Sequence, residues 1–469
     1  MPEYRTERDT LGEVKVPRDA YWGAQTQRAV ENFSISGLRL PPAFVVAQAV
    51  IKRAAAKANV ELGVLDEKVG GALVAAAEEV MAGRWLEQFV VDVFQAGAGT
   101  SQNMNANEVL ANRAEEILGG KLGEYETVHP NDHANMAQST NDTFHAAIHI
   151  SAFVAVRGQL LPAADALAVV LEEKAREFDD VVKCGRTHLQ DAVPLRLGQE
   201  FGAYAASVRA GRARVAAAAE ELRDLCVGGT AVGTGLNTAP GYKPLVIKYI
   251  NEATDGEFRT ASNIFACMQS LDAAAAASGA LRTLATSLVK IADDFRLLSS
   301  GPRTGLGELK LPAVQPGSSA MPGKVNPVMA EMLNMVCFHV MGCDAVVAHA
   351  ARSGQLEINV MMPVVAYNLL QAIEILSRGM EAFAERCVRG VEADAEVCRR
   401  YAESSPALAT ALSPYIGYRR AAELAQRALK ENKSVRELAM EEKLLGDEDL
   451  RKVLDVNKMT EDPDAEKGR

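Results

Sequence analysis

Residues 281–298 read LRTLATSLVKIADDFRLL, and their apolar side chains recur every three or four positions. This spacing places an apolar stripe on one face of a helix. The stripe consists of Leu281, Leu284, Leu288, Ile291, Phe295 and Leu298. Heptad-like stripes pack against other helices. The stretch therefore predicts a long helix inside a helical bundle.

Similar amphipathic patterns lie on both sides of this stretch, at residues 163–182, 199–226 and 328–350. Loops rich in Gly, Pro and Thr interrupt them at 227–242 and 300–327. Alanine-rich runs such as 273–277 favour closely packed helices. We therefore expect a mainly α protein built on an elongated bundle. An alanine-rich stripe can also pack against a second copy of the chain, so we predict a homo-oligomer.

The helical patterns are unevenly distributed along the chain. Residues 1–140 mix short helices with turn-forming clusters and are predicted to form a mixed N-terminal domain. Residues 141–395 are predicted to form the central helical bundle domain. Residues 396–469, which are charged and end in a polar tail, are predicted to form a small C-terminal helical domain.

The composition limits the classes of partner. The chain has 469 residues, a hydrophobic content of 48% and a formal net charge of -11. Nucleic acids and anionic membranes favour basic surfaces, so neither is expected as a partner. The first nine residues are too polar for a signal peptide, and no stretch approaches the roughly 20 apolar residues of a membrane span. We expect a cytoplasmic protein, in which a small anionic substrate would need a local positive pocket.

Neither a metal nor an organic cofactor is expected. The seven cysteines are widely spaced and contain no Cys-x-x-Cys pair, so they are interpreted as reduced and mostly buried. His129 and His133 have the spacing of some metal sites, but Pro130 argues against a regular helix presenting both rings. The Gly-rich run at 228–237 matches neither the dinucleotide fingerprint nor the phosphate loop.

The loop Gly317–Pro327 has the composition of a lid that carries chemistry. Ser318 and Ser319 lie between glycines and offer a proton acceptor on a mobile backbone. Lys324 and Asn326 supply a positive charge and hydrogen bonds suited to a carboxylate. Taken alone, the loop could equally be a Gly/Pro surface loop with a solvated lysine.

Three other polar clusters lie at residues 97–108, 138–142 and 185–191. Each is rich in hydroxyl and amide groups and is followed by helical sequence, so that helix N-termini could converge on an anion. The ordinary alternative is a set of N-caps and Asx turns, and His188 alone would be a structural histidine. Because the clusters are so dispersed, either long helices bring their ends together or different subunits do.

With these four clusters, the chain resembles the fumarase/aspartase superfamily from about Leu11 to Tyr418, and the loop Gly317–Pro327 matches its hallmark. The resemblance implies a three-domain, mainly helical protomer whose central bundle forms the core of a homotetramer. It also implies active sites shared between subunits. The implied chemistry is a reversible elimination that releases fumarate, without a metal or an organic cofactor.

Within the superfamily, the chain is similar to the branch of aspartate ammonia-lyases and class II fumarate hydratases. Residues 98–101, 138–141 and 354–361 resemble aspartases, whereas 128–132 and 228–230 resemble fumarases. Deamination of L-aspartate is therefore the predicted activity, and hydration of fumarate is the alternative. A non-catalytic structural member of the fold is a remote alternative. Ala137, His145 and Met362 depart from the family pattern beside the site motifs and leave the substrate open.

The resemblance also implies a role for each polar side chain. Ser318 would be the general base that removes the Cβ proton, and the product is an aci-carboxylate. The donors to this carboxylate would be Thr100, Ser139, Thr140 and Ser319. The groups that hold the other carboxylate would be Thr187, Lys324 and Asn326.

The remaining implied roles concern the amino group and a second binding site. Asn141 and His188, with Thr100, would position the amino group, so His188 is counted as catalytic. Glu331 would orient His188. His129, Asn131 and Asp132 fall where fumarases hold an accessory carboxylate site.

Overall fold

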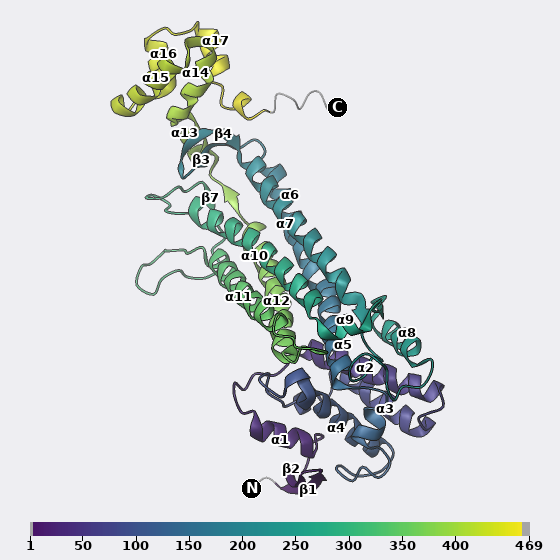
Figure 1. Ribbon diagram of the computed structural model, residues 1–469. Coiled ribbons are helices and arrows are strands. Elements are labelled where there is room, and N and C mark those ends of the chain that lie inside the picture. Colours follow the sequence, from purple (N-terminus) through teal and green to yellow (C-terminus); the bar gives the residue numbers. More distant parts are fainter. Residues whose placement is uncertain (1–2, 462–469) are drawn as a thin grey trace. The chain divides into compact units, whose positions relative to one another are not determined.

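The computed structural model describes residues 3–461 and is mainly helical (Figure 1). The longer helices are α2 (Pro42–Glu61), α3 (Glu67–Met81), α4 (Thr100–Ile117), α5 (Thr140–Ala155), α6 (Leu161–Glu177), α7 (Leu197–Ala219), α8 (Tyr242–Thr254), α10 (Asp272–Leu298), α11 (Val328–Ala351), α12 (Met362–Phe383), α13 (Ala395–Ser404) and α15 (Tyr418–Glu431). The shorter ones are α1 (Ala24–Asn32), α9 (Ile264–Gln269), α14 (Ala409–Ile416), α16 (Val435–Glu441) and α17 (Asp447–Val453).

Strands occur only as pairs within the described residues. The antiparallel pairs are β1 (Tyr4–Asp9) with β2 (Gly12–Pro17), β3 (Val182–Thr187) with β4 (Gln190–Arg196), and β7 (Leu309–Lys310) with β8 (Glu392–Ala393). The parallel pair is β5 (Asp224–Leu225) with β6 (Arg259–Thr260).

The chain divides into two compact units. The first contains the chain up to Pro162, Gly211–Ala285 and Val336–Ser377, and the second contains Ala163–Ala210, Thr286–Met335 and the chain from Arg378 onward. Helices α7, α10, α11 and α12 each contribute residues to both units. The division at 1–140, 141–395 and 396–469 stays a prediction.

The first unit is built around α2, which packs against α3, α5 and α8. Phe44 of α2 meets Phe144 of α5 with ring centroids 4.5 Å apart. Gly99, with φ of 82°, precedes α4, and a Cβ there would lie 2.1 Å from the Phe144 ring. Only glycine fits this close approach, which positions the start of α4 beside α5.

The second unit has an aromatic core. The Phe201 ring of α7 lies 5.1 Å from Phe178 and 5.4 Å from Phe295 of α10, and Phe383 lies 5.2 Å from Phe295. Helices α13 to α17 enclose a further apolar cluster that includes Leu412 and Leu438.

The predicted central helix is confirmed as α10, and all six side chains of its apolar stripe are buried. The predicted helix at 328–350 is α11, which starts after Pro327. The patterns at 163–182 and 199–226 correspond to α6 and α7. Both helices end earlier than predicted, because the chain turns into β3 after α6 and into a 3₁₀ turn at Glu220–Arg223 after α7.

The expectation that no stretch approaches a membrane span needs correction. By length and composition, the segments Thr140–Glu177 and Val328–Ala351 could each cross a membrane, since each contains an 18-residue window with a mean hydropathy of 1.5 and 1.3, respectively. In the first, half of the most apolar window is buried inside the protein. Core helices of helical proteins need apolar residues for packing and pass the same test, so this finding is weak evidence for a span.

Candidate functional site

The Ser318 hydroxyl receives two backbone hydrogen bonds. Its Oγ accepts from the Ala320 N–H at 3.2 Å and from the Met321 N–H at 3.0 Å. Ser318 is half-buried, whereas Ser319 is exposed. Two N–H dipoles aimed at one oxygen favour negative charge on that oxygen. The loop between β7 and α11 (Figure 1) therefore presents a hydroxyl oxygen that accepts from two backbone N–H groups.

The two ends of this loop are clamped together. The Gly317 N–H donates to the Lys324 carbonyl at 2.8 Å, and Asn326 Nδ2 donates to the Gly317 carbonyl at 2.7 Å. A Cβ on Gly317 would lie 2.3 Å from the Lys324 oxygen, so glycine is required. The loop surrounds a hollow of ≈ 530 Å³, lined by residues 313–318 and 321–325. Asn326 thus shapes the loop, and the exposed Lys324 extends from it.

The cluster at 138–142 forms the start of α5. Ser139 is the N-cap, its Oγ accepts from the Asn141 N–H at 3.2 Å, and the Asp142 carboxylate accepts from the Ser139 N–H at 2.9 Å. Asn141 Nδ2 donates to the Ala231 carbonyl at 2.8 Å, and Thr140 is buried. This is a capping box, so helix capping, the alternative to anion binding, accounts for part of the cluster.

Asp142 also holds the Gly-rich run in place. Its Oδ2 accepts from the Gly228 N–H at 2.9 Å and the Thr230 N–H at 3.0 Å. Burial raises the Asp142 pKa to about 6, and it lowers the pKa of Lys52 to about 7. Lys52 Nζ donates to Asn135 Oδ1 at 3.1 Å. Sequence reasoning missed this buried pair of charges, although the Ser-x-x-Asp spacing of the capping box marks Asp142.

We expect replacement of Lys52 by methionine to change how stability depends on pH. An unfolded lysine has a pKa of about 10.4, so above pH 7 the unfolded chain binds a proton that the folded chain lacks. The free energy of unfolding of the wild type, relative to Lys52→Met, should therefore rise by roughly 1 to 2 kcal/mol from pH 7 to 8.5. Urea titrations at several pH values measure this difference. The exposed Lys68→Met is the control, and an equal pH dependence in both variants would contradict the assignment.

Thr100 is the first residue of α4, as expected for a cluster at a helix N-terminus. The preceding residues Ala98 and Gly99 both have positive φ, at 60° and 82°. Ala98 is tied to Val360 by a backbone hydrogen bond of 2.8 Å. Thr100 itself is exposed, so its hydroxyl is accessible.

The cluster at 185–191 is not a helix start, contrary to the prediction. Thr187 and Gln190 pair at the tip of the β3–β4 hairpin, and the turn residues His188 and Leu189 have φ of 56° and 60°. A two-residue hairpin turn of this kind requires a left-handed backbone, which Asn-Gly usually supplies. The hairpin was not predicted because the sequence has no Asn-Gly at this position. Thr187 and His188 are exposed there.

A buried ion pair holds the base of this hairpin. Glu308 is fully buried and lies 3.1 Å from Lys183 and 2.9 Å from Arg186. Glu331, in the first turn of α11, shares no hydrogen bond with His188 in the part of the chain that the structure describes. The predicted orienting contact is therefore not formed within the protomer.

The residues proposed for an accessory site form a π-helical turn at Pro130–Ala134. His129 Nδ1 accepts from the backbone N–H groups of Asn131 and Asp132 at 3.3 Å, and His133 Nδ1 accepts from the His129 N–H at 2.8 Å. Pro130 occupies the first turn, as its lack of an N–H allows. The Nδ1 atoms of both histidines thus cap this turn, while Asn131 and Asp132 are exposed.

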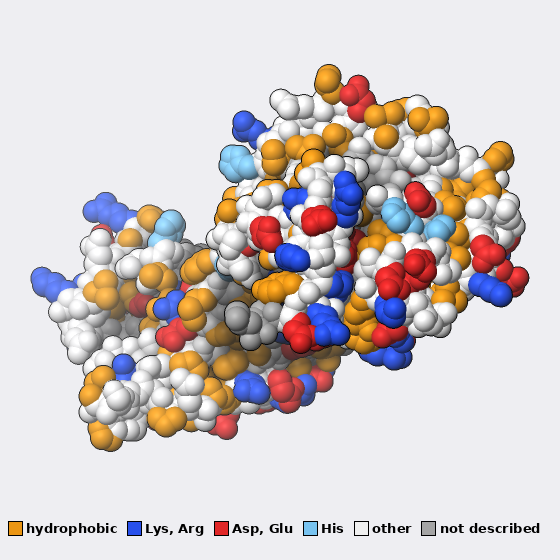
Figure 2. All heavy atoms as spheres, turned by 90° about the horizontal axis from the view of Figure 1, so that it is seen from below, with side chains coloured by type: hydrophobic (Ala, Val, Ile, Leu, Met, Phe, Trp, Pro, Cys, Tyr) orange, Lys and Arg blue, Asp and Glu red, His pale blue; other side chains and the backbone are white. Residues whose placement is uncertain are grey.

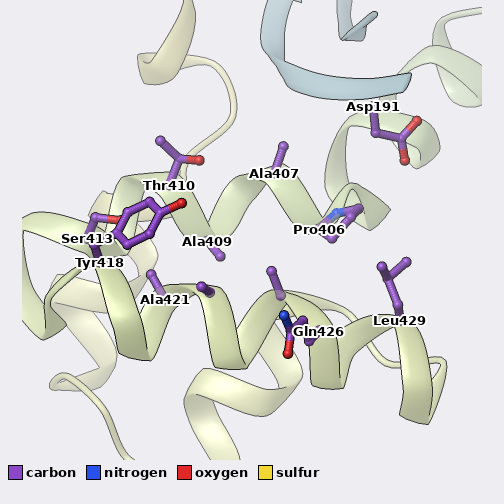
Figure 3. Close-up of a pocket in the computed structure, with 12 residues that line it drawn as sticks. Asp191, Pro406, Ala407, Ala409, Thr410, Ser413, Tyr418, Ala421, Gln426 and Leu429 are labelled. Carbon is purple, nitrogen blue, oxygen red and sulfur yellow. The ribbon is translucent and has the colours of Figure 1, made fainter. Parts of the chain in front are cut away.

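A second hollow has a volume of ≈ 350 Å³ (Figure 3). The turn Pro406–Leu408 and α14 form one side of it, and α15 forms the other. Alanines provide much of its lining, and Asp191 lies at its edge. None of the predicted substrate-binding residues lines it. On the face shown in Figure 2, acidic and basic side chains are interspersed, without a continuous basic area.

The predicted site residues are divided between the two units. The first unit carries Thr100, Ser139, Thr140 and Asn141, and the second carries Thr187, His188, Ser318, Ser319, Lys324, Asn326 and Glu331. Each unit thus presents an incomplete set of polar groups on loops and helix starts.

Comparison with known proteins shows that the chain is a lyase of the fumarase/aspartase superfamily. The family model described as "Lyase" matches residues 12–342, and the model described as "Fumarase C C-terminus" matches 408–461.

Individual relatives extend over nearly the whole chain. The chain is 52% identical to a class II fumarate hydratase of Halobacterium salinarum, over 98% of this chain and 97% of the relative. It is 46% identical to an aspartate ammonia-lyase of Bacillus subtilis, over 98% and 96%. A class II fumarase of Schistosoma mansoni matches the structure with a TM-score of 0.95 and 40% identity, over 98% and 99% of the two chains. The mainly helical, fumarase-like fold is thereby confirmed.

Proposed function

We propose that the protein is a class II fumarate hydratase, which interconverts fumarate and L-malate. This reverses the order of the two activities predicted from the sequence. The support is the set of relatives: class II fumarate hydratases of Halobacterium salinarum, Thermosynechococcus vestitus and Neisseria meningitidis are 52%, 48% and 49% identical to the chain. The match to the C-terminal model of fumarase C adds to it.

The observation that carries the proposed chemistry is the pair of backbone donors on Ser318 Oγ. In the dehydration direction, this oxygen, as an alkoxide, takes the proton from the carbon next to one carboxylate of L-malate. The electron pair of the C–H bond moves into that carboxylate and gives an aci-carboxylate. The aci-carboxylate then returns this electron pair to form the double bond of fumarate, and the C–O bond of the neighbouring carbon breaks. The departing hydroxide would take a proton from His188 and leave as water, and exchange with solvent would restore the protonation of His188 and Ser318.

The polar residues divide the remaining work. The hydroxyls that would donate to the aci-carboxylate are Thr100, Ser139, Thr140 and Ser319. One such donor at developing charge contributes about 3 kcal/mol of transition-state stabilisation. Lys324, Asn326 and Thr187 would hold the other carboxylate. His188 and Asn141 would position the leaving hydroxyl, and Glu331 would orient His188.

We further propose that the complete site is assembled from several copies of the chain in a homotetramer. Each unit carries only part of the set, and His188 and Glu331 share no hydrogen bond or ion pair among the residues described. Exposed apolar side chains on α11 support an interface, since Met335 is 64% exposed and Phe338 is 57% exposed. Size-exclusion chromatography with light scattering tests the tetramer.

Aspartate ammonia-lyase is the second candidate. The motifs at 98–101, 138–141 and 354–361 favour it, as does the 46% identity to the Bacillus subtilis aspartate ammonia-lyase. The same serine base and the same aci-carboxylate serve this reaction, with ammonia as the leaving group. The two reactions therefore differ only in the group held near Asn141 and His188.

The test is incubation of purified protein with L-malate and, separately, with L-aspartate, while the ultraviolet absorbance of fumarate is followed. We expect fumarate from L-malate alone. Fumarate from L-aspartate alone would establish the ammonia-lyase and overturn the proposal. No fumarate from either substrate would favour the non-catalytic member of the fold.

A further inference from the structure

Three metal-ligating side chains that the reaction does not use converge in the first unit. Nδ1 or Nε2 of His145, Sγ of Cys226 and Sγ of Cys267 all lie within 4.8 Å of one another. His145 belongs to α5, Cys226 directly follows β5, and Cys267 belongs to α9. His145 and Cys226 are buried, and Cys267 is half-buried. Three separate segments thus deliver one nitrogen and two sulfurs to one place.

The His145 ring is oriented as a metal ligand requires. Its Nε2 lies 2.9 Å from the Ser270 carbonyl oxygen, so Nε2 carries the proton and donates. Its Nδ1 is buried and has no hydrogen-bond partner among the described residues. A metal-bound histidine typically donates its second N–H to a carbonyl, which fixes the tautomer. The free Nδ1 is otherwise an unsatisfied buried acceptor.

The two thiols lie beside each other and otherwise have only weak partners. Cys226 Sγ lies 3.5 Å from the Asp142 carbonyl, and Cys267 Sγ lies 3.8 Å from the Asp224 carbonyl. A tetrahedral zinc ion with Zn–S bonds of about 2.3 Å requires sulfurs roughly 3.8 Å apart. Sulfurs at the observed limit of 4.8 Å would have to approach each other by about 1 Å to bind one ion.

A hollow beside the cluster supplies access and room for a fourth ligand. It has a volume of ≈ 280 Å³, and its lining includes His145, Cys267 and His149. The His149 ring lies 4.5 Å from that of His145, and its Nε2 is also unpartnered in the described part of the chain. Three protein ligands with an open fourth position are one of the standard arrangements for zinc.

We propose that His145 Nδ1, Cys226 Sγ and Cys267 Sγ bind one divalent cation of the zinc type, with a water molecule or His149 as the fourth ligand. The nitrogen and sulfur donors select zinc or cobalt over magnesium or calcium. The ion would connect α5, β5 and α9 close to the capping box at Ser139. It would stabilise that part of the fold rather than take part in the elimination. The sequence alone gives no signal for this set, because the three residues are far apart in the sequence and no short motif contains them.

The test uses Co²⁺ as the probe, added to the full-length protein after treatment with chelator and reductant. We expect one Co²⁺ per chain and a thiolate-to-cobalt charge-transfer absorbance, which a ligand set without sulfur lacks. Zinc should displace the cobalt. Cys226→Ala should weaken binding at least 10-fold, as should Cys267→Ser. Because Cys267 is half-buried at the hollow, its variant tests the site even if Cys226→Ala fails to fold.

The matched control is Cys343→Ala, which removes a buried cysteine of α11 in the same unit. It should leave the cobalt absorbance and the stoichiometry unchanged. Absence of the charge-transfer band in the wild type would overturn the proposal. A Cys226–Cys267 disulfide that forms even with excess zinc would also overturn it, since the pair would then be a redox couple.

Discussion

Replacement of Ser318 by alanine is expected to reduce turnover by about 10² or more, since removal of a general base costs at least this factor. The substitution removes the oxygen that accepts from the Ala320 and Met321 N–H groups. Both N–H groups lie on an exposed segment, so water replaces the lost acceptor. The thermal midpoint should therefore stay close to that of the wild type. Steady-state formation of fumarate from L-malate measures the loss.

Two comparisons make the Ser318 result specific. Ser404→Ala, an exposed serine at the end of α13, should retain wild-type turnover. If Ser318→Ala kept more than about a tenth of the wild-type rate, the hydroxyl would be only a cap for its turn and another group would be the base. Because both reactions in this family use the same base, this result applies to whichever substrate the protein turns over.

The helical framework could be predicted from local patterns. The apolar residues from Leu281 to Leu298 recur with the period of a helix, and this period predicts a helix with one buried face. The hairpin at 187–190 could not be predicted in this way. His188 and Leu189 adopt the left-handed backbone because the paired strands on either side impose it, against the preference of both residues.

The local structure of the candidate site could be predicted for some clusters and not for others. The helix start at Ser139 follows from the sequence, because a capping residue acts within one turn of its own position. The start of α4 at Thr100 follows Gly99 and has no side-chain cap. The buried charges of Lys52 and Asp142 depend on segments far apart in the chain, and no spacing rule connects them. A few side chains at the site determine the substrate. Short motifs near the site therefore led to the prediction of an ammonia-lyase, whereas similarity over the whole chain favours the hydratase.

Replacement of Lys324 by alanine is expected to raise KM for L-malate about 10- to 100-fold with a smaller change in kcat. A hydrogen bond to a charged group contributes about 1.5 to 3 kcal/mol, which corresponds to this range. A carboxylate that does not react is held about equally in the ground state and the transition state, so its loss appears mainly in KM. Initial rates over a range of L-malate concentrations separate the two constants.

The environment of Lys324 explains why the effect should be confined to binding. Its side chain is exposed, and the contacts that shape the loop use its backbone: its carbonyl accepts from Gly317, and its N–H donates to the Met321 carbonyl. Both contacts persist in Lys324→Ala, so the Ser318 loop should keep its form. Lys324→Arg keeps the charge and should recover part of the affinity, whereas Lys452→Met on α17 should have no effect. An unchanged KM in Lys324→Ala would mean that another cation binds the substrate carboxylate. Equal losses in kcat and kcat/KM would mean that Lys324 stabilises the transition state instead.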